Sequence, residues 1–179
     1  MQWFLVFFPT PENEFMINTP HYEVPKSTLA LLNQVYEVEH KLKRHGDPGN
    51  ALRNLDKIKD ILAEYPYLTY LQDNKFGLYD LDKDTTTNFY GSPWQPYFHN
   101  WAFNLPRNSA KLEEKWAMIP PHTDILITHG PAWGYVDQVK GRPEHLGCEL
   151  LTSYIDNIKP KIHICGHIHS GYGYAYDGV

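Results

Sequence analysis

Two short apolar segments, each followed at once by a histidine beside a glycine, constrain this sequence more than any other feature. Residues 124–128 read Asp-Ile-Leu-Ile-Thr and are followed by His129, and residues 161–165 read Lys-Ile-His-Ile-Cys and lead into Gly166-His167-Ile168-His169. Compact apolar runs of this length are typical of strands buried inside a sheet. We therefore predict two buried strands, each of which ends beside a histidine.

Residues 144–158, which lie between the two strands, have the apolar spacing of a helix. The residues on its apolar face are Leu146, Leu150, Leu151, Tyr154, Ile155 and Ile158. A strand, a helix and a second strand in succession are typical of an α/β fold, and such a crossover makes the two strands parallel. Strands in this setting are covered on both faces. The residues that we therefore expect to be nearly fully buried are Ile125, Leu126, Ile127, Ile162 and Ile164.

The rest of the chain divides near residues 64–66. Before this point an apolar strand is predicted at 1–8, and two amphipathic patterns at 27–44 and 50–65 predict helices. After it, the segments with β-type patterns are 67–71, 77–81 and 88–91, and a short helix is predicted at 108–118. The expected organisation is a divergent strand plus helical segment over 1–65 and an α/β segment over 66–179, within one continuous domain.

The composition argues against several functions. The chain has 179 residues and a net charge of −5. A net negative charge argues against general binding of nucleic-acid backbones, which are themselves negative. No apolar run reaches the roughly eighteen residues of a membrane span, and the apolar start lacks the basic residues of a signal peptide. Cys148 and Cys165 are too few for a disulfide scaffold. We expect a cytoplasmic protein that contacts no membrane.

Three histidines lie where an α/β sheet gathers its ligands, at the carboxyl ends of strands. They are His129, His167 and His169, and glycine at 166 permits the turn that the last two need in order to converge. Imidazole binds Zn, Fe, Mn or Ni, and a hydrolytic site keeps one position open for water or substrate. A lone histidine is more often an ordinary polar residue, which is our interpretation of His122 and His163. The group of three predicts a metal or phosphate site.

Six ordered blocks of residues extend the two histidine motifs. The blocks are YGSPWQP at 90–96, NWAFN at 100–104, IP at 119–120, DILITHGP at 124–131, HLGC at 145–148 and GHIHSGYG at 166–173. Together they resemble the calcineurin-like metallophosphoesterases, in the branch of the metallophosphoesterase-domain-containing proteins and their phage and bacterial relatives. The resemblance covers about residues 66–179.

The resemblance implies a two-sheet α/β sandwich flanked by helices and a two-metal centre that hydrolyses phosphomono- or phosphodiesters, nucleotides among them, with a metal-activated water. It implies divalent Mn, Fe, Zn or Ni as cofactor. His129 and His167 would bind one metal and His169 the other, and these three would be the catalytic residues. His145 would contact the substrate or a ligand, and Trp94 would shape a nucleotide pocket, although packing in an aromatic core explains Trp94 as well.

The sequence departs from the family pattern in its first half. The usual N-terminal metal-binding strands are missing, because no Asp-x-His occurs in the chain. The family also has a Gly-Asp motif and a Gly-Asn-His motif. Residues 45–50 (HGDPGN) contain a Gly-Asp and a Gly-Asn within six residues, but Ala51 occupies the position of the catalytic histidine. Two interpretations stay open. Either unusual residues, a second copy or another chain complete the site, or the chain is a truncated or diverged relative that binds a metal or nucleotide without efficient turnover. Without a bridging carboxylate we expect at most one metal to bind well.

Overall fold

The computed structural model describes residues 5–7, 68–99 and 103–175, and the chain forms two compact units. One unit spans Leu5–Tyr70. Its described residues are strands β1 (Leu5–Phe7) and β2 (Leu68–Tyr70), which pair antiparallel. These confirm the strands predicted near 1–8 and 67–71. The helices predicted at 27–44 and 50–65, and the HGDPGN segment at 45–50, lie outside the described residues.

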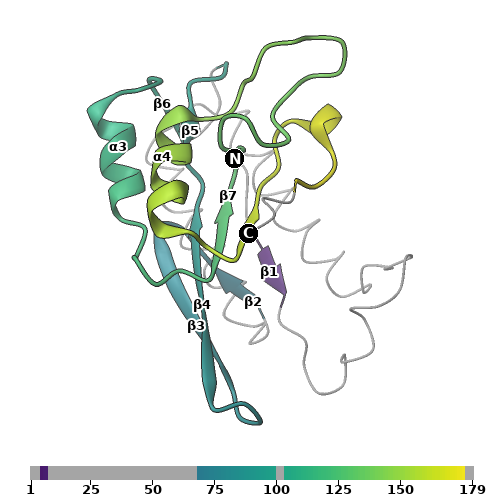
Figure 1. Cartoon of the computed structure of the whole chain (residues 1–179). Coiled ribbons are helices and arrows are strands. Elements are labelled where there is room, and N and C mark those ends of the chain that lie inside the picture. Colours follow the sequence, from purple (N-terminus) through teal and green to yellow (C-terminus); the bar gives the residue numbers. More distant parts are fainter. Residues whose placement is uncertain (1–4, 8–67, 100–102, 176–179) are drawn as a thin grey trace, which may run out of the picture. The chain divides into compact units, whose positions relative to one another are not determined.

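The other unit, which contains Leu71–Val179, is built on a four-stranded mixed sheet in the order β3-β4-β7-β8. Strands β3 (Asn74–Asp80) and β4 (Thr85–Ser92) form an antiparallel hairpin. Strands β7 (Ile125–Thr128) and β8 (Ile162–Ile164) continue the sheet, with β7 parallel to β4 and β8 parallel to β7 (Figure 1). The predicted α/β fold and the predicted pairing of the two histidine-bearing strands are confirmed.

Two short strands and two helices complete the regular structure of this unit. Strands β5 (Gln95–Pro96) and β6 (Asn104–Leu105) pair in parallel, apart from the larger sheet. Helix α3 (Ala110–Ala117) confirms the helix predicted at 108–118, and Ser109 caps it by accepting a hydrogen bond from the amide of Leu112. A search of the described residues finds no helix with the length and apolar character that crossing a membrane requires.

Helix α4 (Glu149–Ile158) begins five residues later than the apolar spacing predicts. The cause is a competing set of backbone hydrogen bonds. The amide of Leu146 donates to the carbonyl oxygen of Asp137 (3.1 Å), and the amide of Cys148 donates to that of Pro131 (3.0 Å). These bonds hold residues 146–148 against the loop after β7, so the segment before Glu149 stays extended although its leucine fits the helical spacing.

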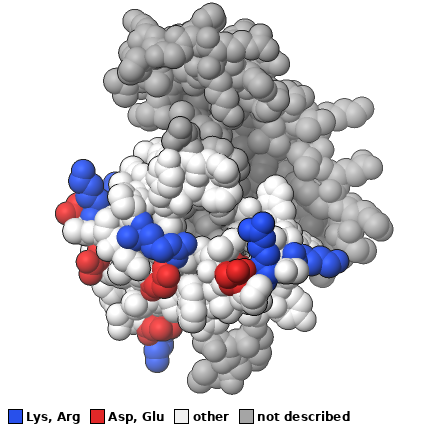
Figure 2. Space-filling view, turned by 90° about the horizontal axis from the view of Figure 1, so that it is seen from above, with Lys and Arg blue, Asp and Glu red and all other residues white. Residues whose placement is uncertain are grey.

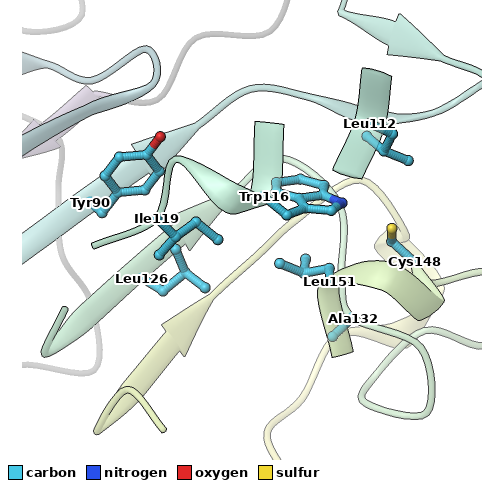
Figure 3. Packing of buried hydrophobic residues seen from close by; sticks show 8 residues of the cluster. All are labelled: Tyr90, Leu112, Trp116, Ile119, Leu126, Ala132, Cys148 and Leu151. Atoms are coloured by element: carbon cyan, nitrogen blue, oxygen red, sulfur yellow. The ribbon is translucent and has the colours of Figure 1, made fainter. Parts of the chain in front are cut away.

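The hydrophobic core lies between the sheet and the two helices, which contact each other on one face of the sheet (Figure 1). Tyr90 of β4 and Leu126 of β7 are cross-strand neighbours and both point to this face. Trp116 of α3 and Leu151 of α4 pack against them (Figure 3). Burying a large apolar side chain of this kind stabilises the folded unit by roughly 1.5–3 kcal/mol.

The expectation that all five apolar strand residues are nearly fully buried is confirmed for Leu126 and Ile127 and wrong for Ile125, which is half-buried, and for both isoleucines of β8. Leu126 and Ile127 are 0% and 4% exposed, but Ile162 and Ile164 are each 50% exposed. His163 is the cross-strand partner of Leu126 and shares its face, so Ile162 and Ile164 lie on the other face with their partners Ile125 and Ile127. The difference in exposure between Ile127 and Ile164 follows the position of their strands, because β7 has a described strand on each side and β8 has one on one side only. The two isoleucines therefore point away from the helices, and β8 is the last strand of the described sheet.

Candidate functional site

His129 and His167 meet at the carboxyl ends of β7 and β8. The amide of His129 donates to the carbonyl oxygen of Ser92 (3.2 Å), which extends the pairing of β4 with β7 by one residue. The carbonyl oxygen of His129 accepts from the amide of Gly166 (3.0 Å), which fixes the chain after β8 beside it. As a result, Nε2 of His129 and Nδ1 of His167 lie 2.9 Å apart.

His167 reaches this position through an unusual backbone conformation. Its φ is 71°, in the left-handed region that residues with a side chain rarely adopt. Such a conformation costs roughly 1–3 kcal/mol, and it is found most often at functional sites. The imidazole of His167 also packs edge-on against the ring of Phe98, with a centroid distance of 4.9 Å. The turn that glycine was predicted to supply is thus made by the histidine itself.

Both rings are held neutral by their surroundings. Burial lowers the pKa of His129 to about 3, and the neighbouring His167 adds to the effect. Burial also lowers the pKa of His167, and the charge of His169 contributes. In a neutral pair one ring nitrogen donates its proton to the other, and which one does so depends on the tautomers. Neutral imidazole is the form that binds a metal ion.

His169 lies two residues beyond His167 and opens a 3₁₀ turn at His169–Gly171. Its side chain is exposed. Within the residues that the structure describes, however, no three His, Cys, Asp or Glu side chains are grouped as a metal ion would require. The structure therefore brings two of the three predicted ligands together, and the role of His169 stays a prediction.

His145 is fixed by a residue that sequence reasoning missed, Asp137. The carboxylate of Asp137 is only 1% exposed. It accepts hydrogen bonds from Nδ1 of His145 (2.6 Å) and from the amides of Gly134 (3.0 Å) and Gly147 (2.9 Å). Burial raises the pKa of Asp137, but these hydrogen bonds, led by that of His145, outweigh burial and lower it. The His145 ring also contacts the ring of Trp133, at a centroid distance of 5.0 Å, and its Nε2 lies 3.4 Å from Nε2 of Gln138.

Trp94, which was predicted to shape a nucleotide pocket, is engaged in packing. Its indole N–H donates to Oδ2 of Asp73 (2.7 Å), and its ring packs edge-on against Phe103. The ammonium group of Lys115 lies over the same ring, 4.7 Å from its centroid, and also binds Asp73 (2.7 Å). These contacts account for Trp94 without a ligand, and a role in substrate binding stays a prediction.

Known proteins similar to this chain place it in a family. No protein-family model matches it. The human protein named metallophosphoesterase domain-containing protein 1 is 43% identical over 129 residues, which are 70% of this chain and 36% of the human protein, and the mouse protein of that name matches equally. A UPF0046 protein of Caenorhabditis elegans is 41% identical over 67% of this chain and 28% of its own length. The chain belongs to a metallophosphoesterase-related family.

The match to this metallophosphoesterase-related family is partial in length, because the chain spans about a third of the first curated relatives, 36% in the human case. One further relative has a different name. It is "Probable rhamnogalacturonate lyase C" of Emericella nidulans, 35% identical over 91% of this chain but only 16% of that protein. A solved structure aligns with 80% of this chain at 16% identity and a TM-score of 0.47, a likeness that supports no statement about the fold.

Proposed function

We propose that this chain is a metal-dependent phosphoesterase that hydrolyses phosphomono- or phosphodiester bonds, with a small phosphate ester or nucleotide as substrate. The observation that carries the proposal is the 2.9 Å approach of Nε2 of His129 and Nδ1 of His167 at the ends of two adjacent parallel strands. Strand ends of this kind are where open α/β sheets bind their ligands. The family relationship supports the same chemistry, since its named members carry a metallophosphoesterase domain.

The donor atoms fit a divalent metal. Two imidazole nitrogens suit Mn, Fe, Zn or Ni, and the lowered pKa values of His129 and His167 remove the proton competition that weakens metal binding. When bound, such an ion polarises a phosphoryl oxygen and lowers the pKa of a water ligand. His129 and His167 would hold it, and His169 is the candidate for a further ligand. In the same proposal the four-stranded sheet is one layer of a two-sheet sandwich.

A second candidate function is binding of a metal or nucleotide without efficient turnover. Two observations favour it. Among the described residues no three-ligand group is found, and the sequence contains no Asp-x-His. Catalytic zinc sites ordinarily use three protein ligands. Under this second proposal the chain is a truncated or diverged relative, whereas the first requires that unusual residues, a second copy of the chain or another protein complete the site.

Turnover of bis(p-nitrophenyl) phosphate with added Mn separates the two functions. Removing the hydrogen-bond partner of a metal ligand typically lowers activity by roughly 10–100-fold. We expect His167→Ala and His129→Ala to lower the rate of hydrolysis by more than this, because each removes a ligand itself. His122→Ala is the matched control, because His122 is exposed. Metal binding without turnover in the unsubstituted chain would favour the second function. Calorimetry that finds no Mn or Zn binding at all would contradict the first function and the metal-binding form of the second.

A further inference from the structure

A pocket of about 380 Å³ opens between the loop after β7 and the segment that follows the two histidines of the GHIH motif. One wall is formed by residues 134–142 and His145, and the other by Ser170, Gly171 and Tyr172. The volume falls within the roughly 300–1,000 Å³ of small-molecule sites. Because the second wall begins directly after His169, the pocket lies next to the candidate metal ligands along the chain.

The walls of this pocket are held in place by specific contacts. The amide of Lys140 donates to Oγ of Ser170 (3.2 Å), and the side chain of Gln138 donates to the carbonyl oxygen of Pro143 (2.8 Å). Val136 and Gly171 touch so closely that a Cβ on Gly171 would lie 2.3 Å from the carbonyl oxygen of Val136. The loop is thus tied to the opposite wall at two points, so the pocket is a built feature of the fold.

The charge inside the pocket is positive. Lys140 and Arg142 line it, and neither forms an ion pair with any residue that the structure describes. Asp137 is the acidic residue in the lining, but its carboxylate is buried and occupied by three hydrogen bonds. Figure 2 looks from above in Figure 1 and shows basic and acidic side chains interspersed on that face.

We propose that this Lys140–Arg142 pocket binds a phosphate group of the ligand, distinct from the group that meets His129 and His167. Arginine offers paired donors that match phosphate, and lysine offers a mobile point charge. The pocket has room for more than one phosphate group, so a ligand with two linked phosphates suits it best. The assignment of this ligand as the substrate rests on the proposed function, whereas binding of phosphate in the pocket does not.

The test is a titration of the full chain with inorganic pyrophosphate, without metal and with EDTA present. The titration is monitored by the NMR signals of the backbone amides. We expect shifts at Gly134, Gly141 and Gly171, which line the pocket. The variant Lys140→Gln/Arg142→Gln should weaken binding by about 10-fold or more, since both charged donors are lost. The control variant Lys75→Gln/Lys111→Gln removes the same charge from exposed sites elsewhere and should bind as the unsubstituted chain does.

Two results would overturn the proposal. One is that the amide signals of the three glycines do not shift when pyrophosphate is added, and the other is that both double variants weaken pyrophosphate binding equally. Retained amide spectra identify variants that are still folded. Because the titration involves no metal and no turnover, its outcome is independent of the phosphoesterase assay. Binding without hydrolysis leaves the pocket assignment standing and removes only the substrate assignment. Hydrolysis without binding leaves the proposed phosphoesterase function standing and removes the pocket assignment.

Discussion

Asp137 shows how a single buried carboxylate organises the loop that carries His145. The loop between β7 and α4 has no regular secondary structure of its own, yet its two ends come together on this side chain. The amides of Gly134 and Gly147 and the ring of His145 all donate to it. A buried hydrogen-bond donor that loses its acceptor lowers the stability of the fold. The conformation of this loop therefore depends on both oxygens of the Asp137 carboxylate.

We expect Asp137→Ala to lower the free energy of unfolding by roughly 2–4 kcal/mol, because two amide donors would lose their partner at about 1–3 kcal/mol each. Asp137→Asn should lose less, since its amide oxygen still accepts a hydrogen bond. The measurement is urea unfolding. Asp156→Ala serves as control, because Asp156 is exposed on α4. Equal effects of Asp137→Ala and Asp156→Ala would show that the carboxylate does not hold the loop.

Among single residues, the sequence predicted where His129 and His167 lie but did not predict that Asp137 holds His145. His129 and His167 were predictable because a strand end fixes where a side chain points. Asp137 carries no such signal, since it lies in an irregular loop and acts through backbone amides that any sequence supplies. Glu144 is a second acid between Gly134 and Gly147, so acidic character does not single out Asp137 either. The left-handed conformation of His167 was likewise hidden, because glycine at 166 looked sufficient for the turn.

The connection from β7 to α4 depends on a close approach between two backbone segments. Ala132 and Cys148 form a parallel bridge, and the amide of Trp133 donates to the carbonyl oxygen of Cys148 (3.2 Å). A Cβ on Gly147 would lie 2.3 Å from the carbonyl oxygen of Ala132. Backbone cannot yield as a flexible side chain can, so only glycine fits at this position.

We therefore expect Gly147→Ala to lower the free energy of unfolding by about 1–3 kcal/mol, the usual cost of overpacking, or more. Gly130→Ala is the matched control, because a Cβ there would meet no atom within 4 Å. Its effect should stay within about 1 kcal/mol. Thermal unfolding of the two variants side by side tests the expectation. If Gly147→Ala is tolerated as well as Gly130→Ala, the two segments are not as close as described.

The strands of the sheet differ in how much they contribute to the core. We expect Leu126→Ala to cost roughly 2–5 kcal/mol, because its side chain is fully buried. Ile164→Ala should lower the free energy of unfolding by about 1 kcal/mol or less, because half of Ile164 is already exposed to water. Denaturant unfolding of both variants gives the comparison. A larger loss for Ile164→Ala would mean that the outer face of β8 is covered.

At the scale of elements, apolar runs identified strands but not their places in the sheet. The segments 124–128 and 161–165 look alike in sequence, and both are strands. Only the first has a described strand on each side. An apolar run does not record whether a strand is central or last, because that depends on pairing with distant segments. The start of α4 was misplaced for a related reason, since the bonds to Pro131 and Asp137 are not visible in the helical spacing.

For the molecule as a whole, its buried histidines predict how stability depends on pH. Burial lowers the pKa of His129 to about 3 and that of His163 to about 4, and it also lowers the pKa of His167. In the unfolded chain each would titrate near 6.5. Between these values the unfolded chain binds more protons than the folded chain, so stability is fully present above about pH 6.5 and is lost as the pH falls toward the folded values.

We expect the metal-free protein to lose stability steadily between about pH 7 and about pH 5, with roughly 2 kcal/mol of the loss due to His163 alone. His163→Gln should reduce the loss by that amount, because glutamine does not titrate and its amide can still bond to Oγ1 of Thr128, where His163 Nε2 lies at 2.8 Å. The carboxyls with lowered pKa are Asp80, Asp124 and Asp137, and they release or bind protons mainly below this window. Urea unfolding with EDTA at both pH values measures the slopes. A stability that stays level or rises on acidification would mean that these histidines become protonated without unfolding, and that the neutral His129–His167 pair is not the state in which the chain folds.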